Sequence, residues 1–147
     1  MDLNQQICKA VKRWKILEVP YEHRGFSRNG CDCTGLIIGV LKEMGYIKSY
    51  RPRSYSLDWN LHSGADNYIV DVISKVTDEI KNPKPGDAVL FYFGRCVAHA
   101  GVVIENGLFV HCNKLSKKCR ASSLWNSPWT KRIFSFYRFN ESKLKAN

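Results

Sequence analysis

The chain has 147 residues, of which 44% are hydrophobic and 12% aromatic. This length suits one domain with one core, and the apolar content excludes wholesale disorder. Lysine and arginine outnumber aspartate and glutamate by 23 to 13, which gives a net charge of +10. The basic excess is compatible with a polyanionic neighbour (nucleic acid, an anionic membrane or an anionic cell-wall polymer) and equally with a solvated basic surface.

The N-terminal stretch MDLNQQICKAVKRWKILEVP lacks the apolar core and the small-residue cleavage site of a secretory signal. No apolar run in the chain is long enough to cross a bilayer. We therefore expect synthesis in the cytoplasm without a standard signal peptide, and no membrane span. The six cysteines are expected to be reduced, because a domain of this size does not need disulfides.

Apolar residues recur at helical spacing in the first half of the chain. This spacing predicts an amphipathic helix over residues 3–16 and a second helix over TGLIIGVLKEMG, residues 34–45. An aromatic- and arginine-rich loop over residues 48–64 separates them from a third predicted helix, which runs from about Asp66 to Ile80.

The second half of the chain contains short β-branched and aromatic runs bounded by turn residues, which is typical of strands. The predicted strands are AVLFYF at 88–93, HAGVVI at 99–104, LFVHC at 108–112 and RIFSFYRF at 132–139. Helices that precede strands favour an α+β domain with an antiparallel sheet. We expect a single domain over residues 1–147, with a core from about 10 to 139 and a short polar tail at 140–147.

The motif GCDCTG places two cysteines at the start of the second predicted helix. Cys33 lies where the loop becomes the helix, and unpaired N–H groups with the helix dipole are expected to lower the pKa of its thiol. Asp32 is expected to cap this helix. Cys31, two residues earlier, is interpreted as a structural or redox bystander that could capture an oxidised Cys33.

A thiolate nucleophile needs an imidazole, and His99 and His111 both lie in predicted strands. If the turn between them had two residues, Val102 would oppose His111 and the imidazoles would point to opposite faces. A three-residue turn over Glu105–Gly107, with a left-handed Gly107, places Gly101 opposite His111 and both imidazoles on one face. A shared site requires the three-residue turn, which we predict.

GCDCTGLI, PGDAVLF, AHAGVVI and ENGLFVHC, taken in this order, resemble the NlpC-type cysteine peptidases, papain-like enzymes that cut cell-wall peptides. The resemblance implies Cys33 as the nucleophile, His99 as the base and His111 as the residue that orients the base. Tyr21 matches the family's Pro-Tyr segment, and with the Cys33 N–H it would help to hold the oxyanion. The implied fold packs the N-terminal helices, including the cysteine-bearing one, on a C-terminal antiparallel sheet.

Further stretches are similar to the compact peptidases of phage tails and gene transfer agents, namely YSLDWN and the Trp-rich SLWNSPWTKRIFSFYRF. This similarity implies peptidoglycan stem peptides as substrate, with cleavage between D-glutamate and a diamino acid. It also implies a place in a phage-like tail, with tail proteins as partners and action in the periplasm or cell wall. No cofactor is implied, and the chain is expected to be a monomer in isolation. Thr34 replaces the commoner serine.

Three other functions fit parts of the sequence. A zinc module would have enough Cys and His ligands, but their spacing is poor, and the side chains of adjacent His111 and Cys112 diverge in a strand. A nucleic-acid binder fits the charge, but no recognisable motif is present, so we expect no specific nucleic acid. A papain-like acyltransferase or amidase would use the same Cys–His pair with another acceptor. We predict the peptidase, without a metal site.

Overall fold

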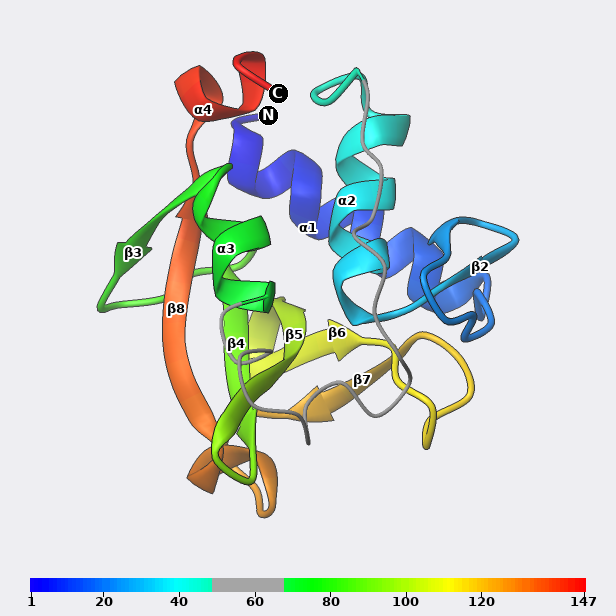
Figure 1. Cartoon of the computed structure of the whole chain (residues 1–147), viewed down its shortest axis with the longest axis vertical. Helices are drawn as coiled ribbons and strands as arrows, with labels where there is room; N and C mark the ends of the chain where they lie inside the picture. Colours follow the sequence, from blue (N-terminus) through cyan, green and yellow to red (C-terminus); the bar gives the residue numbers. More distant parts are fainter. Residues whose placement is uncertain (49–67) are drawn as a thin grey trace.

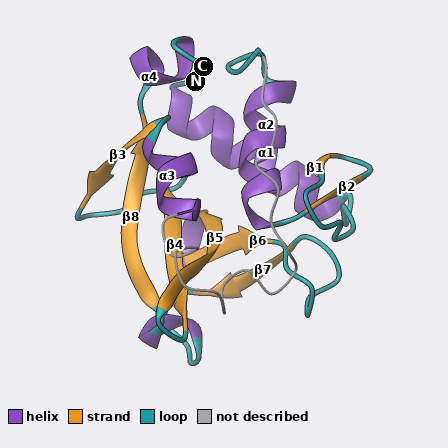
Figure 2. Ribbon diagram, viewed as in Figure 1, coloured by secondary structure: helices purple, strands orange, loops and turns teal. Residues whose placement is uncertain are grey.

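The computed structural model describes residues 1–48 and 68–147, in which helices pack against an antiparallel sheet (Figure 1). The six strands of the sheet have the order β3-β8-β4-β5-β6-β7, and every neighbouring pair is antiparallel. Figure 2 shows helices α1, α2 and α3 in purple on one side of the orange sheet. The predicted α+β class, with helices on a C-terminal antiparallel sheet, is confirmed.

Helix α1 spans Leu3–Ile16, as predicted. Asp2 and Gln5 form a capping box at its start, because the Asp2 carboxylate accepts from the Gln5 N–H and the Gln5 side chain accepts from the Asp2 N–H. The helix buries a stripe that includes Ile7, Val11 and Trp14 against the sheet and α2.

Helix α2 spans Cys33–Glu43 and begins at Asp32, whose side chain accepts a hydrogen bond from the Gly35 N–H at 2.8 Å. The predicted capping role of Asp32 is therefore confirmed. Gly35 has no side chain because a Cβ there would collide with the carbonyl oxygen of Gly25. This contact holds the start of α2 tightly against the loop that precedes it.

Helix α3 spans only Tyr68–Ser74, and β3 follows at Thr77–Ile80, so the predicted helix to Ile80 is wrong over its last six residues. The Thr77 hydroxyl donates to the Ile73 carbonyl at 2.7 Å, and Thr77–Ile80 then pairs with β8. Apolar spacing cannot distinguish a helix from an edge strand that a distant partner recruits. The expected aromatic-rich loop lies almost wholly outside the described residues.

The predicted strands of the second half are confirmed to within three residues at each end. The strands are β4 Ala88–Phe93, β5 Cys96–Val103, β6 Leu108–His111 and β8 Ile133–Phe139, with a small separate pair formed by β1 Phe26–Ser27 and β2 Gly30–Cys31. Strand β7, Arg120–Ser123, was not predicted, because RASS has no apolar alternation. The segment expected to be a polar tail contains helix α4, Glu141–Lys145, which buries Leu144.

The two faces of the sheet carry different cores. The larger core lies between the sheet and the helices and includes Leu36, Ala100 and Val110. A smaller core on the other face is built around Phe91 and Phe109. Within residues 1–48 and 68–147, no helix combines the length and apolar character needed to cross a membrane.

Candidate active site

A pocket opens where the start of α2 meets the β4–β5 hairpin and the segment after β6. The residues that line it include Tyr21, His23, Cys33, His99, Cys112 and Lys114. Three side chains singled out in the sequence, Tyr21, Cys33 and His99, therefore share one cavity. They come from three separate parts of the chain, which the packing of α2 on β5 brings together.

Cys33 is the first residue of α2, and its side chain is partly exposed in the pocket. Burial, followed by the Asp32 carboxylate, raises the pKa of its thiol, and backbone N–H groups of Ala100 and Thr34 only partly offset this. The expected lowering of this pKa by the helix start is therefore wrong. Desolvation and an adjacent negative charge outweigh the helix N–H groups, so the resting side chain is a neutral thiol.

The turn between β5 and β6 has three residues, Glu105–Gly107, as predicted. Val102 pairs with Val110 and Val103 with Phe109, a register that continues to Gly101 opposite His111. Gly107 has the expected positive φ of 69°, and Asn106 also lies in the left-handed region at 63°. His99 and His111 therefore share one sheet face, where both are almost completely buried.

The two imidazoles form a hydrogen-bonded relay with Ser122 of β7. His99 Nε2 lies 2.9 Å from His111 Nδ1, and His111 Nε2 lies 2.8 Å from Ser122 Oγ. Two tautomer arrangements satisfy both bonds. In one of them each ring carries its hydrogen on Nε2 and Ser122 is the terminal acceptor, which leaves His99 Nδ1 as a free base.

Aromatic rings enclose His99 on the face that it shares with the smaller core. Phe93 stacks on it at 5.5 Å with an interplanar angle of 4°, and Trp129 lies 5.3 Å away at 30°. A β-bulge accompanies this position, because Phe91 pairs with His99 whereas Tyr92 pairs with Val97. Bulges re-aim side chains, and here His99 reaches the pocket that holds Cys33.

Burial keeps both imidazoles neutral. Burial first, and then His111 and Arg132, hold the pKa of His99 well below its ordinary value. Burial and then Arg120 lower the pKa of His111 to about 3. A neutral imidazole can accept a proton, so the pocket pairs a neutral thiol with a neutral base. This is the arrangement of a nucleophile that is activated when it attacks, without a resting ion pair.

Tyr21 lies beside Cys33 with its phenol protonated. Burial, followed by Asp32, Cys33 and Cys112, raises the pKa of Tyr21 to about 12. Its backbone is held by a hydrogen bond from the Tyr21 N–H to the Lys117 carbonyl at 2.8 Å. The hydroxyl is thus a neutral hydrogen-bond donor at the wall of the pocket.

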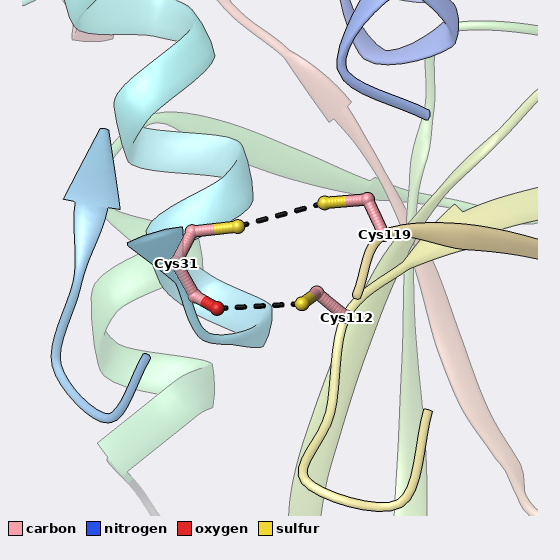
Figure 3. Close-up of side chains that lie close together, drawn as sticks. All are labelled: Cys31, Cys112 and Cys119. Atoms are coloured by element: carbon pink, nitrogen blue, oxygen red, sulfur yellow. Dashed lines mark hydrogen bonds between the residues drawn. The ribbon is translucent and has the colours of Figure 1, made fainter. Parts of the chain in front are cut away.

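The two cysteines of GCDC have different surroundings. Cys31 is fully buried in the larger core, with its Sγ 3.6 Å from Cys119 Sγ (Figure 3). Cys112, which sequence reasoning did not place at the site, lines the pocket with Cys33. Cys112 and His111 diverge from β6, as the alternation of a strand requires.

Ser122 and Trp129 contact the histidines but were not among the predicted site residues. Ser122 lies in the strand that lacked an apolar signal, and Trp129 lies in a short 3₁₀ turn after it. Ser122 can be placed on the same sheet face as His111 only when the register of β6 and β7 is known, in which His111 pairs with Arg120. No local pattern in the sequence marks Ser122, whereas Trp129 lies in the Trp-rich segment SLWNSPWTKRIFSFYRF.

Comparison with known proteins identifies the family of the chain. The NlpC/P60 family model matches residues 18–138. The chain is 27% identical over 121 residues to the probable endopeptidase NlpC of Escherichia coli (strain K12). This alignment covers 81% of this chain and 68% of that protein.

Solved structures share the fold. NlpC2 from Trichomonas vaginalis superposes with a TM-score of 0.69 and 19% identity over 95% of this chain and 48% of that one. The peptidoglycan hydrolase RipB from Mycobacterium tuberculosis superposes with a TM-score of 0.56 and 19% identity, and the match covers 92% of this chain and 65% of that one. The chain spans about half the length of the first of these structures. With most of its length matched by the family model, the chain belongs to the NlpC/P60 family.

Proposed function

We propose that this protein is a cysteine peptidase that hydrolyses amide bonds in peptidoglycan stem peptides. The observation that carries the proposal is the pocket in which Cys33, at the start of α2, meets the buried relay that begins at His99. Membership of the NlpC/P60 family supports it, as does the naming of one relative as a probable endopeptidase and another as a peptidoglycan hydrolase.

In the proposed reaction, Cys33 Sγ attacks the amide carbonyl carbon while its proton passes to His99 Nδ1. A C–S bond forms, and the carbonyl oxygen becomes an oxyanion. We assign its stabilisation to the Cys33 N–H and the Tyr21 hydroxyl, because both residues line the pocket. Collapse of this intermediate breaks the C–N bond as His99 returns the proton to the leaving amine. Water, deprotonated by His99, then cleaves the thioester to a carboxylic acid and restores the thiol.

His111 acts through His99. When His99 accepts a proton, the lone pair of His111 Nδ1 faces the Nε2–H of the imidazolium at 2.9 Å. This bond keeps the His99 ring oriented and favours its charged form at the moment when a proton arrives. Ser122 Oγ can accept from the Nε2–H of the His111 tautomer whose Nδ1 accepts this bond.

The pocket also suits an anionic peptide. Lys114 lies in its wall, on the pocket that Asp32 also lines, and the net charge of +10 attracts an anionic cell wall. We assign the scissile bond to the link between D-glutamate and the diamino acid, which leaves a carboxylate for Lys114 to contact. The experiment is digestion of purified murein by the wild type, by Cys33→Ala and by the matched control Cys96→Ala, with products identified by mass.

We expect wild type and Cys96→Ala to release fragments that end at D-glutamate and Cys33→Ala to release none. Equal release by Cys33→Ala would contradict the peptidase assignment, and fragments with other ends would contradict the assigned bond. An added amine acceptor distinguishes the acyltransferase, because transfer would yield the amide in place of the acid.

Association with a phage-like tail is the finer part of the proposal. It rests on the similarity of YSLDWN and of the Trp-rich segment to tail-borne peptidases. Detection of the chain by mass spectrometry in purified phage-like particles from its host would support it. Its absence from particles in which the other tail proteins are detected would refute it.

A further inference from the structure

Three of the six cysteines converge on one buried point. Cys31 of β2, Cys112 after β6 and Cys119 before β7 place their Sγ atoms within 4.8 Å of one another (Figure 3). Their exposed fractions are 0%, 0% and 1%. We call these three residues the cysteine cluster. The proposed reaction uses none of them.

The spacing of the sulfurs matches the geometry of a metal site. A thiolate binds Zn²⁺ at about 2.3 Å, so two sulfurs on one ion lie about 3.8 Å apart. Cys31 Sγ and Cys119 Sγ are 3.6 Å apart, and the third sulfur lies within the same small volume. A disulfide requires about 2.05 Å and would leave one of the three sulfurs out.

The contacts inside the cluster also leave room for a cation. Cys31 Sγ and Cys119 Sγ lie 3.6 Å apart, and the Cys112 thiol donates to the Cys31 carbonyl at 3.3 Å. A metal ion that displaces the thiol protons would bind all three sulfurs.

We propose that Cys31, Cys112 and Cys119 form a tri-thiolate site for one thiophilic metal ion. Thiolates select Cu(I) and Zn²⁺ among the metals of cells, so these ions are the ligand class. Three thiolates complete the coordination of Cu(I), whereas Zn²⁺ takes a fourth ligand. Cys112 lines the catalytic pocket, which gives the ion a route to the cluster. This inference departs from the sequence-based prediction of no metal site.

The ion would join β2, through Cys31, to the segment 112–119, which carries the other two ligands. Both are already hydrogen-bonded to the segment 19–21, because the Cys31 N–H donates to the Pro20 carbonyl and the Cys119 N–H donates to the Val19 carbonyl at 2.8 Å. Tyr21 of the segment 19–21 and Lys114 of the segment 112–119 both line the pocket. A metal cross-link would therefore stabilise the substrate-binding wall beside the nucleophile.

The test uses the full-length reduced protein in the Cys33→Ser background, so that the nucleophile supplies no ligand. Zn²⁺ is titrated against a chromophoric chelator, and Cu(I) against a Cu(I)-specific chelator. We expect one equivalent to bind and a rise in Tm. In the same background, Cys119→Ser should weaken binding about 100-fold or more, and the control Cys96→Ser should leave it unchanged.

Alkylation with peptide mapping provides a readout that does not depend on a folded variant. The bound ion should protect the three cluster cysteines of the wild type and leave Cys96 reactive. No saturable binding, unchanged binding in Cys119→Ser, or a Cys31–Cys119 disulfide formed in place of the metal complex would each overturn the proposal. Binding is measured without the nucleophile, so failure here is distinct from failure of the peptidase assignment.

Discussion

Two adjacent residues at the end of β6 serve two different regions. His111 points into the relay with His99 and Ser122, where hydrogen bonds of 2.9 and 2.8 Å engage both of its ring nitrogens. Cys112 points the other way, into the cysteine cluster, where the contacts are longer sulfur interactions such as the 3.3 Å approach to the Cys31 carbonyl. The relay orients its rings through hydrogen bonds between nitrogen and oxygen atoms, whereas the cluster holds thiol protons that a metal could displace.

The two buried, neutral imidazoles of the relay predict that the folded protein loses stability in acid. The folded-state pKa of His111 is about 3 against an ordinary 6.5, so between these values the unfolded chain binds a proton that the folded chain excludes. The free energy of unfolding should therefore fall by several kcal/mol as pH drops through this window, and His99 adds to the loss. Urea unfolding across the window measures it.

His111→Asn is the variant that isolates this contribution. It removes one of the two buried imidazoles, so the pH slope of the unfolding free energy should be shallower than in the wild type. A slope equal to that of the wild type would show that His111 is not a source of the acid instability.

His111→Ala tests the relay as catalytic support. Loss of the acceptor beside His99 Nε2 should lower kcat/KM on murein peptides about 100-fold, within the range for groups that assist proton transfer. His111→Asn restores an oxygen acceptor and should recover most of this loss. Equal damage by both variants, measured on folded protein, would mean that His111 only fills space.

The pH dependence of Cys33 alkylation distinguishes a resting neutral thiol from a resting ion pair of thiolate and imidazolium. Because burial and Asp32 raise its pKa, the alkylation rate of Cys33 should climb about tenfold per pH unit and continue to rise above the ordinary thiol value of about 8.5. Peptide mapping after timed iodoacetamide treatment measures the rate. A plateau below neutral pH would instead establish the lowered thiol pKa that was expected from the helix start alone.

The sequence was most informative where chemistry depends on local spacing. The start of α2 at Cys33, its Asp32 cap and the three-residue turn that aligns the histidines all follow from neighbouring residues. Long-range pairing and desolvation could not be read in this way. Thr77–Ile80 became a strand because β8 paired with it, and the pKa of Cys33 rose because distant segments buried it.

The cysteine cluster shows the same limit. Spacing argued against a metal site because Cys31, Cys112 and Cys119 form no pattern along the chain. They meet only because the Val19–Pro20 segment pairs with Lys118 and Cys119, which brings β2 against the start of β7. Alternation along β6 correctly separated Cys112 from His111, but it could not supply the partners of Cys112.

Ser122 gives the smallest expected effect and the most selective test of the relay. Ser122→Ala removes the acceptor for the His111 Nε2–H, a neutral hydrogen bond worth about 1 kcal/mol, so kcat/KM should fall about fivefold. A merely structural role would lower stability without moving the pH profile. Loss of the hydrogen bond to His111 Nε2–H should instead shift the acid limb of kcat/KM. Without that acceptor, His111 would less often present the Nδ1 lone pair that stabilises protonated His99.

The neighbouring Ser123 is the matched control, since its hydroxyl accepts from the Trp125 N–H at 3.1 Å and it pairs with Leu108, away from the histidines. Ser123→Ala should leave kcat/KM and its acid limb unchanged, whereas Ser122→Thr, which keeps the hydroxyl, should restore both. If Ser122→Ala and Ser123→Ala behave alike, the relay ends at His111, and the packing of Phe109 and Trp129 on the His111 ring is what holds it in place.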